Sequence, residues 1–285
     1  MTNVMGSHDF TDYLKSMPVI PEIATKVLKM AEGNGVSFAE LETTIERDPS
    51  LTARVLKVAN SALYSRPRGV TTLSSAVSFL GFNTIRSLVI LVAGASLFEK
   101  DRRRPFFRAF WRQSLSTAFH AKALAFHTGH SEVAEAAFTG GLLHNLGQVA
   151  LYYADPVGYE PVWAGVGADQ RLETRETEVY GFCHRDVGAQ VLEAWNFPPL
   201  YIDIVRDHGK TQFSSPYRSL VILVSVAGFL ASNQDSRRQK SLPLSLLAGH
   251  LAHLRLDEAS LNDWAREFGT TLESLPLYRE CRSLF

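Results

Sequence analysis

An apolar helical run ends in a histidine followed by an amide in the stretch Gly141-Leu142-Leu143-His144-Asn145-Leu146-Gly147. A His-Asp pair at this place would combine an imidazole with a hard, anionic carboxylate, which binds a divalent ion and lowers the pKa of its bound water. Asn145 is neutral and a poor ligand. The stretch therefore indicates a helical scaffold for a metal site that lacks one charge.

Apolar residues recur at helical spacing along nearly the whole chain, and the alternation typical of strands is hard to find. The sequence therefore predicts an all-α fold. Capping residues mark the helix starts, because Ser37 and Glu40 form a capping box and the Asp48 carboxylate precedes Pro49 at the next first turn. Later helices are expected over about 131–144, 171–180, 184–195, 200–206, 217–231, 244–254 and 258–268.

The composition favours a globular protein without a charged partner surface. The 285 residues are 46% hydrophobic, and Lys plus Arg equal Asp plus Glu at 29 each. We therefore expect no direct nucleic-acid partner and no attraction to an anionic membrane. The two cysteines, Cys183 and Cys281, give neither a disulfide framework nor a cysteine-based zinc spacing, so both are expected to be free thiols in a reducing compartment.

The N-terminal residues argue against secretion, and the lengths of the apolar runs argue against a membrane partner. Met1 to Phe10 is polar, without the basic and apolar regions of a secretory signal. Leu88 to Leu97 and Leu220 to Ala231 both fall short of the roughly 20 residues that cross a bilayer. We expect a cytoplasmic protein with buried apolar helices.

A series of ordered motifs extends over residues 13–210. The motifs are Met17-Pro18-Val19-Ile20-Pro21, Asp48-Pro49-Ser50-Leu51-Thr52, Val58-Ala59-Asn60-Ser61-Ala62-Leu63-Tyr64, Ala76-Val77-Ser78-Phe79-Leu80-Gly81, the stretch around His144, Tyr180-Gly181-Phe182-Cys183-His184 with Val187-Gly188-Ala189, and Trp195-Asn196-Phe197-Pro198. In this order they resemble the HDOD family, the HD-related output domains of bacterial signalling proteins. Residues 213–285 match less distinctly.

The resemblance implies a domain organisation. An HDOD domain is expected over 13–212, with a helical N-terminal half at 13–100 packed on a degenerate HD-like half at 101–212, followed by a helical C-terminal extension at 213–285. The polar, charged and proline-ended segment from Lys100 to Pro105 supports the internal boundary.

The resemblance also implies that the HD metal site is degenerate. Its first histidine would fall near Gln113, its paired aspartate at Asn145 and its late aspartate near Gly228, so all three are replaced. The imidazoles that remain are vestigial candidate metal ligands: His144, His184 and His208, the last preceded by Asp207. Three imidazoles could hold a zinc-like ion if they converge, but each could equally bridge packed helices through its two ring nitrogens.

The leading functional hypothesis is a non-catalytic signal-transduction or regulatory module that binds another signalling protein. No catalytic or cofactor-binding residue is assigned, and no cofactor is expected except a divalent metal in the alternative. That alternative is a metal-dependent phosphohydrolase or phosphodiesterase with an altered ligand set, so enzyme activity stays open. A third hypothesis is a module that binds a small anionic ligand, and the oligomeric state is also open.

Other polar features have simpler interpretations. The run Arg102-Arg103-Arg104 is typical of a solvated linker, and Arg66 and Arg68 follow a family motif. His250 and His253 share a helix face and are interpreted as surface or interface residues. Cys183 precedes His184, but neighbours in sequence seldom point at each other, so a buried thiol is expected rather than a nucleophile.

Overall fold

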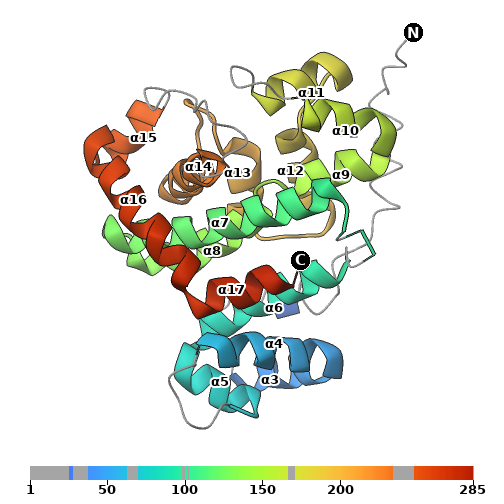
Figure 1. Cartoon of the computed structure of the whole chain (residues 1–285), viewed down its shortest axis with the longest axis vertical. Coiled ribbons are helices and arrows are strands. Elements are labelled where there is room, and N and C mark those ends of the chain that lie inside the picture. Colours follow the sequence, from blue (N-terminus) through green and yellow to red (C-terminus); the bar gives the residue numbers. More distant parts are fainter. Residues whose placement is uncertain are drawn as a thin grey trace. The chain divides into compact units, whose positions relative to one another are not determined.

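The described part of the chain is helical. A computed structural model describes residues 26–27, 38–62, 70–97, 100–101, 103–165, 171–233 and 247–284, and within these ranges it contains helices but no strand (Figure 1). The predicted all-α fold class is confirmed. The capping box at Ser37, the loop with Arg66 and Arg68, and Arg102 lie outside the described residues.

Helix bounds follow the predicted ones closely where a helix was expected. The first helices are α3 (Phe38–Glu46), α4 (Pro49–Ala62), α5 (Leu73–Leu80), α6 (Phe82–Leu97), α7 (Pro105–His127), the 3-10 turn η1 (Ser131–Val133), α8 (Ala134–Leu143) and α9 (Leu146–Ala154). The later ones are α10 (Pro156–Ala164), α11 (Leu172–Tyr180), α12 (His184–Ala194), α13 (Pro199–Asp207), α14 (Arg218–Asn233), α15 (Ala248–His253), α16 (Glu258–Ser274) and α17 (Pro276–Ser283). Helices α9, α10 and α17 were not among the expected ranges.

The chain forms two compact units, and each is described by itself. One unit contains the described residues of 116–265, and the other contains those of 19–115 and 266–285. The divisions fall inside α7 and α16. The limits of these compact units do not test the domain boundaries predicted at 100/101 and 212/213, which stay predictions.

In the unit of 19–115 and 266–285, α4 packs against α3, α5, α6 and α17. Leu51, Val55 and Val58 are buried along α4. The predicted cap is confirmed, because the backbone N–H of Leu51 donates to Asp48 Oδ1 at 3.0 Å. The carboxylate thus satisfies one of the free backbone donors at the start of α4.

Asn60, near the end of α4, is bonded to Val70. Its amide Nδ2 donates to the carbonyl of Val70 at 2.9 Å, and its Oδ1 accepts from the Val70 N–H at 2.7 Å. One side chain thus satisfies both backbone groups of a buried residue ten positions away. Asn60, in the family motif, therefore joins the end of α4 to the residue Val70.

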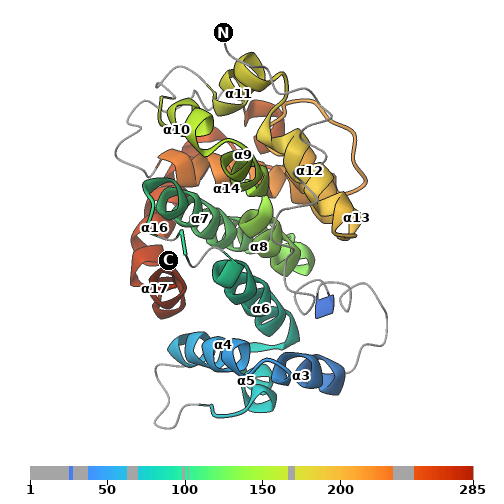
Figure 2. The same cartoon turned by 90° about the vertical axis from the view of Figure 1, so that its right-hand side faces the viewer.

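In the unit of 116–265, α12 lies between α9 and α13, and α12 and α13 run side by side (Figure 2). The α9 and α12 backbones touch at two glycines. A Cβ atom added to Gly147 would lie 1.8 Å from the His184 carbonyl oxygen and 2.7 Å from the Gly188 nitrogen. Only glycine permits this approach, which brings the segments carrying His144 and His184 together.

Within the described ranges, no single helix has the length and apolar character needed to cross a membrane. The one pair that reaches this length together, α5 with α6, is bent by 119°.

Candidate functional site: a buried histidine cluster

The three histidines singled out in the sequence lie together inside the unit of 116–265. The ring centroids of His144 and His208 are 5.1 Å apart with the planes at 84°, and those of His184 and His208 are 5.6 Å apart. All three side chains are buried. Residues separated by up to 64 positions thus share one interior cluster.

Each histidine stands at a helix end, where the chain turns and an imidazole can reach inward. His144 directly follows α8, His184 is the first residue of α12, and His208 directly follows α13. The Nδ1 atom of His144 lies 2.7 Å from the Gly141 carbonyl oxygen, and that of His208 lies 2.8 Å from the Val205 carbonyl oxygen. A carbonyl only accepts, so Nδ1 carries the proton in both rings.

His184 has a charged partner. Its Nδ1 and its backbone N–H lie 2.6 Å and 2.8 Å from Oε2 of Glu176, which is fully buried on α11. The other carboxylate oxygen, Oε1, accepts from the Tyr159 hydroxyl of α10 at 2.6 Å. Glu176 therefore receives three hydrogen bonds, which is the arrangement that makes a buried carboxylate tolerable.

The three histidines of the cluster differ in the direction of their pKa shifts. Burial lowers the pKa of His144 to about 4 and that of His208 well below its ordinary value, with the neighbouring histidines adding to both shifts. Burial also acts downward on His184, but the Glu176 carboxylate outweighs it and the net pKa of His184 is raised. At pH 6 the cluster thus favours one positive charge, on His184, beside two neutral imidazoles.

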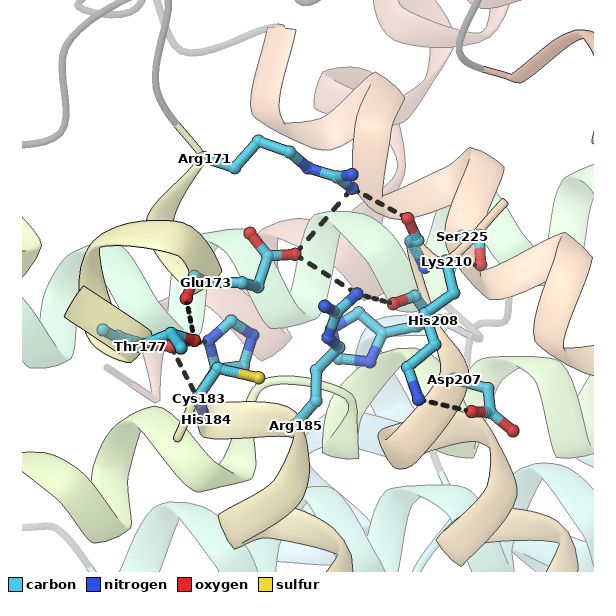
Figure 3. A network of polar contacts seen from close by, with 12 residues as sticks. Arg171, Glu173, Thr177, Cys183, His184, Arg185, Asp207, His208, Lys210 and Ser225 are labelled. Carbon is cyan, nitrogen blue, oxygen red and sulfur yellow. Dashed lines mark hydrogen bonds and ion pairs between the residues drawn. The ribbon is translucent and has the colours of Figure 1, made fainter. Parts of the chain in front are cut away.

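Two arginines fix the loop that carries His208. Arg185 Nη1 donates to the His208 carbonyl at 3.0 Å, and Arg171 Nη2 donates to the Gly209 carbonyl at 2.8 Å. Figure 3 shows Glu173 joined to both guanidinium groups, at 3.6 Å and 3.9 Å. Gly209 has a φ of 72°, and its N–H donates to Ser225 Oγ, so the sharp turn after α13 is held from three helices.

The positions where an HD site would have its other ligands bear no carboxylate. Asn145 is buried next to His144. A Cβ atom added to Gly228 would lie 3.6 Å from His144 Nε2 and 3.8 Å from Thr117 Cγ2, so a side chain at 228 would face the cluster. Gln113, which was expected near this place, lies one helical turn before Thr117 on α7. Thr117 is fully buried, and its hydroxyl has no hydrogen-bond partner among the described residues.

The residues present do not fit a metal centre of the HD type. Anchoring Nδ1 and leaving Nε2 available is the arrangement of a metal-binding histidine. However, the carboxylates of Glu173 and Glu176 are used by arginines, tyrosine and His184, and none completes the set. Across the described ranges, no group of three or more His, Cys, Asp or Glu side chains is placed so that it could hold a metal ion.

Neighbouring candidates have structural partners. Asp207 pairs with Lys210 at 2.8 Å rather than with the histidines. The buried Cys183 thiol donates to Asp186 Oδ2 at 3.1 Å, within the capping box of α12, and burial raises the pKa of this thiol. His253 is exposed as expected, but the surface interpretation of His250 is wrong, because α15 turns that side chain into the interior, where it is 3% exposed.

Sequence reasoning missed Glu176 and Tyr159. Helix α11 reads Leu172-Glu-Thr-Arg-Glu-Thr-Glu-Val-Tyr180, a charged pattern typical of a solvated helix. Glu176 lies one helical turn from both Leu172 and Tyr180, but a carboxylate at such a position is ordinarily solvated. Only the fold, which turns one face of α11 toward His184, identifies the residue.

Comparisons with known proteins agree with this architecture. A family model described as the HDOD domain matches residues 17–211. An uncharacterized protein of Treponema pallidum (strain Nichols) is 26% identical over 242 residues, which cover 83% of this chain but 46% of that protein. The chain thus spans about half the length of this relative.

Solved structures show the same fold. An HDOD domain protein of unknown function from Geobacter sulfurreducens is 21% identical with a TM-score of 0.75, over 98% of this chain and 97% of that one. A Shewanella amazonensis SB2B protein, provisionally named a phosphohydrolase, is 23% identical with a TM-score of 0.74 over 99% of both chains. A Marinobacter aquaeolei VT8 protein, provisionally named a signal transduction protein, is 20% identical with a TM-score of 0.78, over all of this chain and 67% of that one.

The family model matches well over half of the 285 residues, and the chain belongs to the HDOD family.

Proposed function

We propose that this protein is a non-catalytic HDOD module that acts in signal transduction or regulation by binding another signalling protein. The observation that carries the proposal is the internal use of the histidine cluster. Each Nδ1 is bonded to a group of the protein itself, and Gln113, Asn145 and Gly228 stand where the family resemblance places the other ligands of a hydrolytic site. The cytoplasmic location expected from the sequence belongs to the same proposal.

In this proposal, the polar groups of the cluster have a structural role. His144 joins the end of α8 to the interior, His184 joins α12 to α11 through Glu176, and His208 lies at the turn that two arginines hold. The cluster thereby brings together three helix ends, those of α8, α12 and α13. A partner would contact the surface that these helix ends support, with no reaction at the interior.

A metal-dependent phosphohydrolase is the second candidate. It is favoured by the Nε2 atoms of His144, His184 and His208, to which no hydrogen bond is found within the described ranges. Such a site would need its open coordination position and its proton donors from groups other than carboxylates. The name of the Shewanella protein is consistent with this candidate, but at 23% identity it bears on the fold alone.

One experiment separates the two candidates. The purified chain is analysed for bound metal and assayed with a phosphomonoester, a linear phosphodiester and a cyclic dinucleotide, with added magnesium, manganese, nickel or zinc. We expect no hydrolysis above the metal-only blank. Stoichiometric metal together with turnover that His208→Ala abolishes would overturn the proposal.

The binding part of the proposal needs a positive result as well. The chain is used as bait in a lysate of its own bacterium, with chemical cross-linking and mass spectrometry. We expect a signalling protein in stoichiometric amount, and recovery that is the same with and without a chelator. Reproducible capture of no protein at all would count against partner binding.

A further inference from the structure

A second pair of histidines lies at the surface of the unit of 116–265, apart from the buried cluster. His130 follows the turn after α7, where Gly129 has a φ of 79°, and His253 ends α15. Their ring centroids are 6.5 Å apart and the ring planes differ by 24°. His253 is exposed and His130 is half-buried, so an ion from solution can reach both.

One nitrogen of each ring is held by a hydroxyl group. The Thr128 hydroxyl donates to the Leu124 carbonyl at 2.8 Å, so its oxygen accepts from His130 Nδ1 at 3.0 Å. This bond places the proton on Nδ1 and leaves Nε2 with a free lone pair. His253 Nε2 lies 2.9 Å from Ser219 Oγ, and in the tautomer in which Nε2 donates to this oxygen, Nδ1 has a lone pair for a metal ion.

We propose that His130 and His253 form a two-histidine site for a divalent transition-metal ion of the zinc, nickel and copper class, with water in the remaining coordination positions. Imidazole nitrogen is a favoured ligand of these ions, and a hydrogen bond to the second ring nitrogen orients each ligand. Bound metal links the turn after α7 to α15, and so ties the C-terminal extension to the HD-like helices of the same unit. A site of two histidines and water is compatible with the lack of any larger ligand group in the described ranges.

The charges around the pair set limits on its affinity. Burial, then Arg218, then His130 lower the pKa of His253, which keeps that imidazole neutral and able to bind a metal near neutral pH. Arg218, at the start of α14, donates to the Phe213 carbonyl, and its positive charge opposes that of a bound ion. Removing this charge is therefore expected to strengthen binding.

The test is calorimetric titration of the chelator-treated full chain with zinc sulfate and, separately, nickel chloride. We expect about one ion per chain, with His130→Ala and His253→Ala each weakening the affinity by about tenfold or more. His127→Ala is the matched control, because His127 is an exposed neighbour that contacts Trp264 with ring centroids 5.6 Å apart and is not part of the pair. Arg218→Gln is expected to tighten binding.

Each contrary result overturns the proposal. Wild-type protein that binds no zinc or nickel excludes the site. Binding that survives both His130→Ala and His253→Ala but is lost in His208→Ala assigns the ion to the buried cluster. Thermal unfolding of the metal-free variants checks that they are folded, since both substitutions lie at the surface.

Discussion

The segment 48–70 and the buried histidine cluster both carry family motifs, but their polar side chains find different kinds of partner. Asp48 and Asn60 bond only to backbone groups. The cluster bonds to two backbone carbonyls and also contains a buried ion pair between His184 and Glu176. Polar motifs can thus be explained by architecture in both regions, while only the cluster contains buried histidines and a buried ion pair.

The strongest way to break the cluster is to separate the helices that form it. Gly147→Ala would place a methyl group 1.8 Å from the His184 carbonyl oxygen, against backbone that cannot move without displacing α12. We expect a loss of more than about 3 kcal/mol in the free energy of unfolding, or failure to fold. Denaturant unfolding measures it, with Gly249→Ala as control, because a Cβ atom there meets nothing within 4 Å.

Acid should weaken the cluster and leave the segment 48–70 less affected. The folded pKa values of His144 and His208 lie below the unfolded value of about 6.5, so the unfolded chain takes up protons that the folded chain refuses. Each histidine then lowers the free energy of unfolding by about 1.4 kcal/mol per pH unit, from pH 6.5 down to its folded pKa. For His144 that limit is about 4.

The contribution of His184 to the pH dependence of stability has the opposite sign. Its folded pKa is raised, so its contribution is complete below the unfolded pKa and is lost as the pH rises through the folded pKa. Denaturant unfolding between pH 4 and 9 tests both signs. The slope below pH 6.5 should fall by about 1.4 kcal/mol per pH unit in His144→Ala, and an unchanged slope would show that His144 is not held neutral.

His144→Ala distinguishes a structural role of this histidine from a catalytic one. The substitution leaves the Gly141 carbonyl without its imidazole partner and opens a space beside His208, so we expect a loss of about 1–3 kcal/mol in stability. Any phosphoesterase rate should be unchanged. An unaltered melting temperature combined with a lost activity would reverse the interpretation.

The smallest expected effect lies in the other region. Asp48→Ala removes the cap on the Leu51 N–H and should cost about 1 kcal/mol of unfolding free energy. The cost should not change between pH 5 and 8, because no histidine takes part. Asp48→Asn, which can still cap, should retain most of the stability; equal losses in both variants would point to a role of the charge instead.

The sequence predicted most of the helices, though not α9, α10 and α17, and it did not predict the partners of the buried histidines. Apolar spacing and the Asp48-Pro49 start predict α4 correctly, because these are local effects within one helix. The grouping of His144, His184 and His208 came from the family resemblance and agrees with the structure. Glu176 was missed, although it shares a helix face with Leu172 and Tyr180, because a carboxylate is ordinarily solvated. His250 was likewise wrongly placed on the surface.

The central claim is that the histidine cluster is completed by the protein's own groups, with a single charge on His184. Nitrogen-15 NMR of the histidine rings at pH 6, with and without chelator and with one equivalent of zinc, tests it most directly. The account predicts two ring protons on His184, one proton on Nδ1 of both His144 and His208, and no change in these rings with chelator or zinc. A neutral His184 would contradict the claim. Zinc-dependent shifts in all three rings would also contradict it and would favour a metal centre formed by these histidines.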